Sequence, residues 1–272
     1  MLNMHKWRLI NSGDQTGAMN MALDEALLNS VANGRSLPVL RFYRWHPATV
    51  TLGYAQSVHT DLDLDVCASA GLDVVRRSTG GRAVLHDNEV TYSVIAPLNT
   101  GLFGGSVLEC YRVISEVLQK TLLQLSLPAE LVPGKSRGGQ QNAMKAVCFS
   151  VPSQYELVIE GRKVAGSAQK RHGQCFLQHG SIPLEMDLEL LGKALKIDQK
   201  MATSGSLESV GWLNQWSKKK LTIDEVEEVL AEVFSTHLQV EWDLSEPSLS
   251  ELQEAQSLCA EKFSCPEWNL KR

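Results

Sequence analysis

A run of twelve residues, RRSTGGRAVLHD, spans Arg76–Asp87 and offers several groups that could bind an anionic or strongly polar ligand. Glycine tolerates positive φ and lets a ligand approach the main chain closely, so Gly80 and Gly81 could present N–H groups to a carbonyl. The run also carries guanidinium groups, which suit phosphates and carboxylates, on Arg76, Arg77 and Arg82. The alternative is an ordinary Gly-Gly hairpin with solvated arginines, because glycine pairs are common in turns.

Two later segments also combine glycine with polar side chains: YELVIEGRKVAGSAQ at residues 155–169 and LQHGSI at residues 177–182. With the first run they resemble, in the same order, the signature segments of the superfamily of lipoate-protein ligases, octanoyltransferases and biotin ligases. Those segments read R-R-x-[ST]-G-G-[GR]-A-V-x-H-D, G-x-K-[VI]-[AS]-G-[SN]-A and H-G-[ST]-[IL]. The resemblance covers roughly residues 5–240 and implies the α/β fold of the biotin/lipoyl protein ligase catalytic domain.

Within the superfamily, the first run is most similar to octanoyltransferases of the LipM type, whose loop reads TGGRAVLHD as residues 79–87 do. Lipoate ligases usually have a third glycine where this chain has Arg82. They also commonly carry a C-terminal domain of about a hundred residues, whereas about thirty residues follow the last family-like strand here, too few for a domain. In the LipM type the acyl-carrying cysteine lies between the helix after the signature and the lysine-bearing strand, and Cys148 has that position.

The resemblance therefore implies catalytic roles for Cys148 and Lys163. A cysteine nucleophile divides acyl transfer into two steps through an acyl-thioester enzyme. The pKa of a free cysteine is about 8.5 and a nearby cation lowers it, so Lys163 could stabilise the thiolate. It could also stabilise the oxyanion and relay a proton from the acceptor amine. The implied substrate contacts come from all three segments: Arg76, Arg77, Thr79, Gly80, Gly81, Arg82, His86, Gly166, Ser167, Ala168, His179 and Gly180.

Each of these side chains also has a simpler interpretation. Cys148 alone could be a buried small side chain, and Lys163 alone would be a surface lysine in a turn. Cys175 is a rival nucleophile because it precedes His179 by four residues, although its position at the start of a strand favours packing. His86 and His179 could contact substrate or could be hydrogen-bonded parts of the framework.

Apolar periodicity predicts the elements that position these groups. Strands are predicted at residues 7–10, 39–45, 49–53, 72–75, 90–95, 130–132, 155–159, 163–169 and 174–183, with 155–159 and 163–169 paired as a hairpin. Helices are predicted at residues 17–32, from a cap at Asp61 to residue 70, and at 106–125, with later helices beginning at capping boxes of Thr222 and Ser248. The absence of regular βαβ alternation predicts an α/β fold with a mixed, mainly antiparallel sheet flanked by helices.

We expect residues 1–245 to form the acyltransferase catalytic domain and residues 246–272 a C-terminal helical extension packed on it. Tyr43, Val84 and Leu85 are predicted to line an apolar tunnel for the acyl chain. The glycine-rich segment 134–145 carries basic side chains and no acidic one, namely Lys135, Arg137 and Lys145. It is predicted to be a mobile loop that docks an acidic protein partner, the alternative being a solvated loop.

Composition excludes several classes of protein. The chain has 272 residues, 43% hydrophobic and 21% charged, as is typical of soluble globular proteins, and its net charge of −5 argues against general nucleic-acid binding. It has no apolar run of about 20 residues and no signal-peptide core at its N-terminus, which predicts a cytoplasmic protein without membrane association. None of the six cysteines forms a C-x-x-C pair, so neither a metal site nor a disulfide is expected, and Cys67 and Cys110 are predicted to lie in the core.

The resemblance predicts an octanoyltransferase that uses a cysteine thioester and no cofactor. Its donor would be octanoyl-acyl carrier protein and its acceptor a lysine of a lipoyl domain, such as glycine cleavage H protein, in the first step of endogenous lipoate biosynthesis. The alternatives are a lipoyl or octanoyl amidotransferase between lipoyl domains and an ATP-dependent lipoate-protein ligase. From another class, the chain could be a catalytically silent module that binds carrier proteins.

Overall fold

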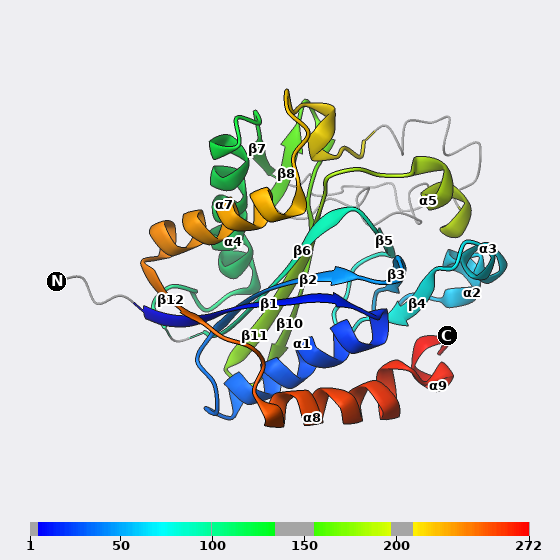
Figure 1. Cartoon of the computed structure of the whole chain (residues 1–272), viewed down its shortest axis with the longest axis horizontal. Coiled ribbons are helices and arrows are strands. Elements are labelled where there is room, and N and C mark those ends of the chain that lie inside the picture. The colour runs from blue at the N-terminus through cyan, green and yellow to red at the C-terminus, as the bar shows by residue number, and fades with distance from the viewer. Residues whose placement is uncertain (1–4, 99, 134–154, 197–208, 272) are drawn as a thin grey trace.

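A computed structural model describes residues 5–98, 100–133, 155–196 and 209–271 (Figure 1). Cys148 and the basic segment 134–145 lie outside these residues. The main sheet has six strands in the order β10-β11-β6-β2-β1-β12. Their bounds are Gly166–His172, Cys175–Pro183, Glu89–Pro97, Val39–Trp45, His5–Gln15 and Val240–Leu244.

The main sheet is mixed. Strand β1 runs parallel to both β2 and β12, whereas the pairs β2–β6, β6–β11 and β11–β10 are antiparallel. The predicted mixed, mainly antiparallel sheet with flanking helices is therefore confirmed.

Helices cover both faces of this sheet because its strands alternate their side chains between two cores. Tyr92 and Val94 of β6 face a core that includes side chains of α4 (Val107–Gln124) and α7 (Ile223–Leu238). Ile95 of the same strand faces the other core, built on α1 (Gly17–Ala32). Helix α8 (Leu249–Leu258) lies along α1, as Figure 1 shows.

Capping residues in the sequence mark the starts of several helices. The capping boxes predicted at Thr222 and Ser248 are present, and Ser106 with Glu109 forms a third at the start of α4. The expected cap at Asp61 is wrong. Two short helices, α2 (Val58–Asp61) and α3 (Leu64–Ser69), replace the single one, and Asp63 caps α3 by accepting from the N–H of Val66.

A three-stranded sheet holds both ends of the signature run. Its order is β4-β3-β5, with β3 at Thr49–Leu52, β4 at Asp73–Arg76 and β5 at Val84–His86. Strand β3 pairs in parallel with β4 and antiparallel with β5. The strand β5 was not expected. Because β4 and β5 both pair with β3, residues 77–83 form a loop that connects the two outer strands of this sheet.

The predicted hairpin of 155–159 with 163–169 is wrong in its second half. Strand β8 (Tyr155–Ile159) pairs with β7 (Glu130–Pro133) and with a two-residue β9 (Arg162–Lys163). The chain then leaves that sheet through the buried residues Val164 and Ala165 and continues as β10, where it pairs with β11. Burial of these two apolar side chains in the core on the α4 face drives the change of sheet.

The remaining elements are α5 (Leu188–Ala194), η2 (Leu213–Gln215), a π-helical turn η3 (Cys259–Phe263) and α9 (Pro266–Asn269). Cys67 and Cys110 are buried, as predicted, and both are free thiols. Within the part of the chain that the structure describes, no helix is both long and apolar enough to cross a membrane. Over the same residues, no three His, Cys, Asp or Glu side chains are grouped as metal ligands would be.

Candidate functional site

A pocket with about 350 Å³ of empty space, part of which is open solvent, lies where the sheet of β4, β3 and β5 meets strands β10, β11 and β6 of the main sheet. It is lined by Met21, Tyr43, Trp45, Arg77, Val84, His86, Thr91, Gly166, Ser167, Ala168, His179, Gly180 and Ser181. Apolar and aromatic side chains of this lining stand beside a few convergent polar groups, a composition typical of small-molecule sites. The lining therefore suits a ligand that has an apolar part.

The fold brings together residues from all three signature segments around this pocket. Seven of the predicted substrate contacts line it: Arg77, His86, Gly166, Ser167, Ala168, His179 and Gly180. Of the side chains predicted for an apolar tunnel, Tyr43 and Val84 also line it and Leu85 does not. Val84 and Leu85 both pack in a third core that includes Leu52, and Val84 contacts the pocket as well.

The glycine loop is held against the end of β3 by close main-chain contact. Gly81 has φ of +95°, which favours glycine, and its carbonyl would lie 2.0 Å from a Cβ placed on Gly53. Any side chain at Gly53 would therefore displace the loop. Gly180 is constrained in a similar way, because its Cβ would lie 2.7 Å from the Tyr92 hydroxyl.

His179 stands between a carboxylate and the signature loop. Its Nδ1 lies 3.1 Å from Oδ2 of Asp24, and its Nε2 lies 2.8 Å from Oγ1 of Thr79. Burial lowers the pKa of His179, although Asp24 opposes this effect. Burial acts to raise the pKa of Asp24, but the His179 bond and the Arg41 charge outweigh it and leave that pKa below its usual value. The pair is therefore a neutral imidazole beside an ionised carboxylate.

His86 has a similar arrangement on the other side of the pocket. Its Nδ1 lies 2.7 Å from Oε1 of Glu89, and its Nε2 lies 2.8 Å from Oγ1 of Thr51. The ring stacks on Trp45 with centroids 4.2 Å apart. His86 is thus fixed on three sides, with 5% of its surface exposed.

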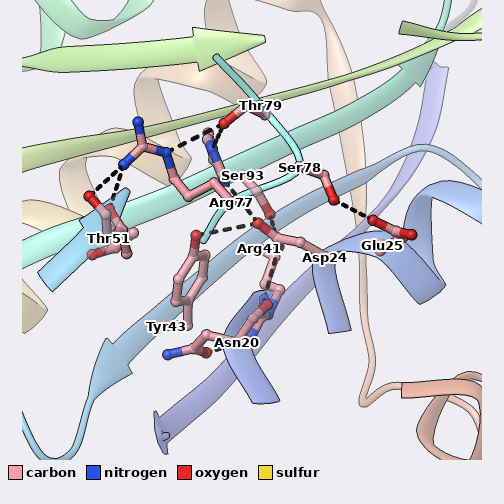
Figure 2. A network of polar contacts seen from close by, with 12 residues as sticks. Asn20, Asp24, Glu25, Arg41, Tyr43, Thr51, Arg77, Ser78, Thr79 and Ser93 are labelled. Atoms are coloured by element: carbon pink, nitrogen blue, oxygen red, sulfur yellow. Dashed lines mark hydrogen bonds and ion pairs between the residues drawn. The ribbon is translucent and has the colours of Figure 1, made fainter. Parts of the chain in front are cut away.

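Arg77 lies between these two histidine arrangements, and its side chain reaches between Thr51 and Thr79 (Figure 2). Its Nε donates to Thr79, and one terminal nitrogen donates to both the hydroxyl and the carbonyl of Thr51. The other terminal nitrogen donates to the carbonyls of Gly80 at 3.0 Å and Arg82 at 2.9 Å. These bonds engage the guanidinium with the protein itself, so we expect Arg77 to shape the loop rather than to receive a phosphate.

Arg76 is fully buried and does not line the pocket. Its guanidinium donates to carbonyls of the segment after β3, at Gly53, Tyr54 and Gln56, and of the C-terminal segment, at Trp268, Asn269 and Lys271. Its main-chain N–H and C=O also bond to side chains of Asn269 and Trp268. Arg76 therefore joins the C-terminal segment to the base of the signature loop.

Replacement of Trp268 by alanine should destabilise the protein by about 3 kcal/mol, near the lower end of the values for large aromatic residues. The change removes ring contacts with Phe263 and Lys271 as well as the bond from Nε1 to the Arg76 carbonyl. The matched variant Trp268→Phe loses mainly that bond, which contributes about 1 kcal/mol. Denaturant unfolding should give the highest midpoint for the wild type, a lower one for Trp268→Phe and the lowest for Trp268→Ala. Equal unfolding midpoints for wild type and Trp268→Ala would show that the C-terminal contacts do not stabilise the protein.

Lys163 is not the surface lysine that its sequence surroundings suggest. Its exposed fraction is 6%, its main chain bonds to Ser209 and Gly211, and its Nζ lies 3.1 Å from Oε1 of Glu156. The segment that contains Ser209 and Gly211 covers β9 from the side, which the sequence does not indicate. Lys163 does not line the pocket described above.

Of the two candidate nucleophiles, only Cys175 falls within the described residues. It has an exposed fraction of 5%, packs in the core beside α1, and burial raises the pKa of its thiol. A raised pKa leaves little thiolate at neutral pH, which is the opposite of what a nucleophile needs. Cys148 remains the proposed nucleophile.

The family described as the lipoyl protein ligase A/B catalytic domain matches residues 16–235. The chain belongs to this family. Over 97% of its length it is 40% identical to octanoyltransferase LipM of Carboxydothermus hydrogenoformans, of which the alignment covers 98%. Octanoyltransferases LipM of Bacillus subtilis and Staphylococcus aureus are 40% and 39% identical over 98% of this chain, with 98% and 99% of their own lengths covered. The predicted family and enzyme class, an acyltransferase of the LipM type, are confirmed.

Solved structures of the family share the fold. A lipoate-protein ligase A bound with ATP is 26% identical, with a TM-score of 0.80 and 98% of both chains covered. A putative lipoate protein ligase of Thermoplasma acidophilum with bound lipoic acid is also 26% identical, with a TM-score of 0.80 and 99% of both chains covered. The predicted catalytic-domain fold is thus confirmed.

Two buried carboxylates beside the candidate site, those of Asp24 and Glu89, were not predicted from the sequence. Asp24 lies on the buried side of α1, and Glu89 opens β6 two residues after the end of the signature run; both are almost fully buried. A charged residue within an apolar helical stripe is a detectable signal, because buried carboxylates need partners. The partner of Asp24 was not predictable, because His179 lies 155 residues away on another element, whereas Glu89 follows its partner His86 by only three residues.

Proposed function

We propose that this protein transfers an octanoyl group from a carrier-protein thioester to a lysine of a lipoyl domain through an acyl thioester on Cys148. The observation that carries the proposal is the convergence of all three signature segments on one pocket. They do so in a chain about 40% identical along its whole length to octanoyltransferases.

The pocket suits an aliphatic acyl group. Met21, Tyr43, Trp45 and Val84 supply apolar side-chain surface, and the two buried histidines hold their ring nitrogens in bonds to the protein. Burial of a hydrocarbon chain contributes about 0.8 kcal/mol for each CH₂. An octanoyl chain would therefore bind mainly through its methylene groups.

The reaction has two acyl transfers. The Cys148 thiolate attacks the donor carbonyl and expels the carrier thiol, and the acceptor amine then attacks the new thioester and regenerates the cysteine. Lys163 would stabilise the oxyanion formed in each step and take part in transferring the proton of the amine. The thioester donor is already activated, so neither ATP nor a metal ion is required.

The proposed acceptor and donor are both proteins. A solved structure of the family, 26% identical to this chain, is described as a bipartite lipoate protein ligase and its E2 lipoyl domain. We extend that class of acceptor to this chain, with glycine cleavage H protein as one example, and propose acyl carrier protein as the donor. The basic side chains of segment 134–145 would meet acidic side chains of these partners.

Incubation with octanoyl-acyl carrier protein, without ATP or magnesium, should add one octanoyl group to the protein. Intact-mass spectrometry measures the adduct, and hydroxylamine should remove it because a thioester is labile to this nucleophile. Addition of a lipoyl domain should then transfer the group to that domain. A strict requirement for ATP and a free acid would instead assign the chain to the ligases. Acylation by an octanoylated lipoyl domain but not by the carrier protein would indicate an amidotransferase.

A further inference from the structure

Two chains of hydrogen bonds, each running from carboxylate to histidine to threonine, end on the same guanidinium group. The first consists of Asp24, His179 and Thr79, and the second of Glu89, His86 and Thr51. Both threonine hydroxyls bond to Arg77. The members come from α1, β11, β6, β5, β3 and the signature loop, so that only the folded chain assembles them.

An ionised carboxylate can only accept hydrogen bonds, and this sets the direction of the first chain. Asp24 accepts from the N–H at Nδ1 of His179, so Nε2 of the neutral ring accepts the hydroxyl hydrogen of Thr79, whose oxygen also accepts from Arg77. The second chain has the same order of groups, and Glu89 also accepts from the hydroxyls of Thr91 and Ser181, so the same direction is expected there. The lowered pKa of His179 agrees with this neutral tautomer.

The position of Arg77 also affects the main chain of the glycine loop. Arg77 binds the carbonyls of Gly80 and Arg82. In a trans peptide the C=O and the following N–H point in opposite directions, so the N–H groups of Gly81 and Ala83 face away from Arg77. The orientation of these donors thus depends on Arg77, and that of Arg77 depends on the two chains.

We propose that Asp24 and Glu89 are positioning residues for acyl transfer. Each carboxylate fixes one histidine tautomer, and the two threonines together hold Arg77 so that the Gly80–Ala83 main chain presents its N–H groups to the acyl carbonyl. The proposal rests on the proposed function for its chemistry, but the tautomers can be tested without substrate. It assigns a role to two acidic residues that do not act on substrate directly.

The surroundings of Asp24 predict what an amide would do there. Oδ1 accepts from Arg41 at 2.7 Å and from Ser93 at 2.9 Å, whereas Oδ2 faces Tyr43 and His179. Arg41 can only donate, so the amide oxygen of an Asp24→Asn side chain remains with Arg41 and its NH₂ group faces His179. His179 then has to accept at Nδ1, which moves its hydrogen to Nε2 and reverses its bond with Thr79. Thr79 Oγ1 would then accept from both His179 and Arg77 while its own hydrogen loses its acceptor, so the first chain would hold Arg77 less firmly than in the native protein.

The first experiment is nitrogen NMR of the imidazole rings in the free protein near neutral pH. In the native protein both His179 and His86 should carry their hydrogen on Nδ1. In Asp24→Asn, His179 should change to the Nε2–H tautomer and His86 should not. A native His179 already protonated on Nε2, or one whose tautomer does not change in the variant, would overturn the proposal whether or not the protein transfers octanoate.

The second experiment measures kcat and KM of octanoyl transfer for variants at the threonines. Thr51→Val and Thr79→Val keep nearly the same shape but lose the hydroxyl, and each should lower kcat by about 10²–10³-fold, as the loss of an oxyanion donor does. KM should change little, because the acyl pocket is unaltered. Thr51→Ser retains the hydroxyl and should restore most of the rate, which a role confined to packing would not explain.

A matched control comes from another buried carboxylate. Glu251 of α8 is 2% exposed, binds Arg8 at 2.8 Å and does not line the pocket. Glu251→Gln should lower the unfolding midpoint and leave kcat unchanged. If it lowers kcat as much as Asp24→Asn does, the effect is one of general stability and the proposal is wrong.

Coupling between the two chains gives the final test. Because both chains act on Arg77, the double variant Asp24→Asn/Thr51→Val should lose little more activity than the worse single variant. If the double variant instead loses activity by the product of the two single fold-losses, the chains act independently, and this would contradict their convergence on Arg77. Complete lack of transfer by the native protein, with both tautomers as expected, would contradict the proposed function but not the hydrogen-bond chains.

Discussion

Cys148→Ser should abolish octanoyl transfer, with a loss of at least about 10⁴-fold in kcat, because removal of a catalytic nucleophile has effects of that size or larger. A serine hydroxyl is not ionised at neutral pH, whereas a cysteine near a cation is partly thiolate. The same variant should also fail to form the hydroxylamine-sensitive adduct. Intact mass after incubation with octanoyl-carrier protein measures the adduct, and single-turnover kinetics measures the rate.

Cys175→Ser is the matched control. Its thiol is buried beside α1 with a raised pKa, so the variant should keep the adduct and most of the rate. A small loss of stability is expected, since the hydroxyl is more polar than the thiol in an apolar site. If Cys175→Ser eliminates the adduct and Cys148→Ser does not, the nucleophile has been assigned to the wrong cysteine.

Lys163→Met should lower kcat by about 10²–10³-fold, the usual cost of losing one oxyanion donor. Methionine retains most of the apolar stem of the side chain and removes the ammonium group. This choice matters because Lys163 is almost buried, and alanine would add a packing defect to the loss of charge. Initial rates and thermal melts on the same preparation separate the two effects.

Glu156→Gln gives the comparison for Lys163. It weakens the contact of 3.1 Å with Nζ but leaves the ammonium group in place, so its kcat should fall much less than that of Lys163→Met. Near wild-type activity of Lys163→Met would remove the lysine from the mechanism. A large fall in melting temperature with equal losses of activity in both variants would make the ion pair structural.

Local sequence patterns determined a large part of the fold. The helix at residues 17–32 and the capping boxes at Thr222 and Ser248 depend on contacts within a few residues, and they were predicted correctly. The family membership was also predictable, because it rests on the order and identity of residues in three short segments. The larger error occurred where a distant segment supplied the partner, because β9 ends at Lys163, which pairs with residues 209–211. The wrong cap at Asp61 was a local error of two residues.

The same distinction between local pattern and distant contact holds for the functional side chains. The sequence by itself identified the signature residues, including Arg77, His86 and His179, and indicated an acyltransferase. Only the tertiary structure decided that Arg77 is enclosed by two histidine chains and that Arg76 is bound to the C-terminal segment. It also decided that Asp24, 155 residues before His179, is the partner of that ring. The physical reason is that periodicity encodes which face of an element is buried, whereas strand order and register decide which buried polar groups meet.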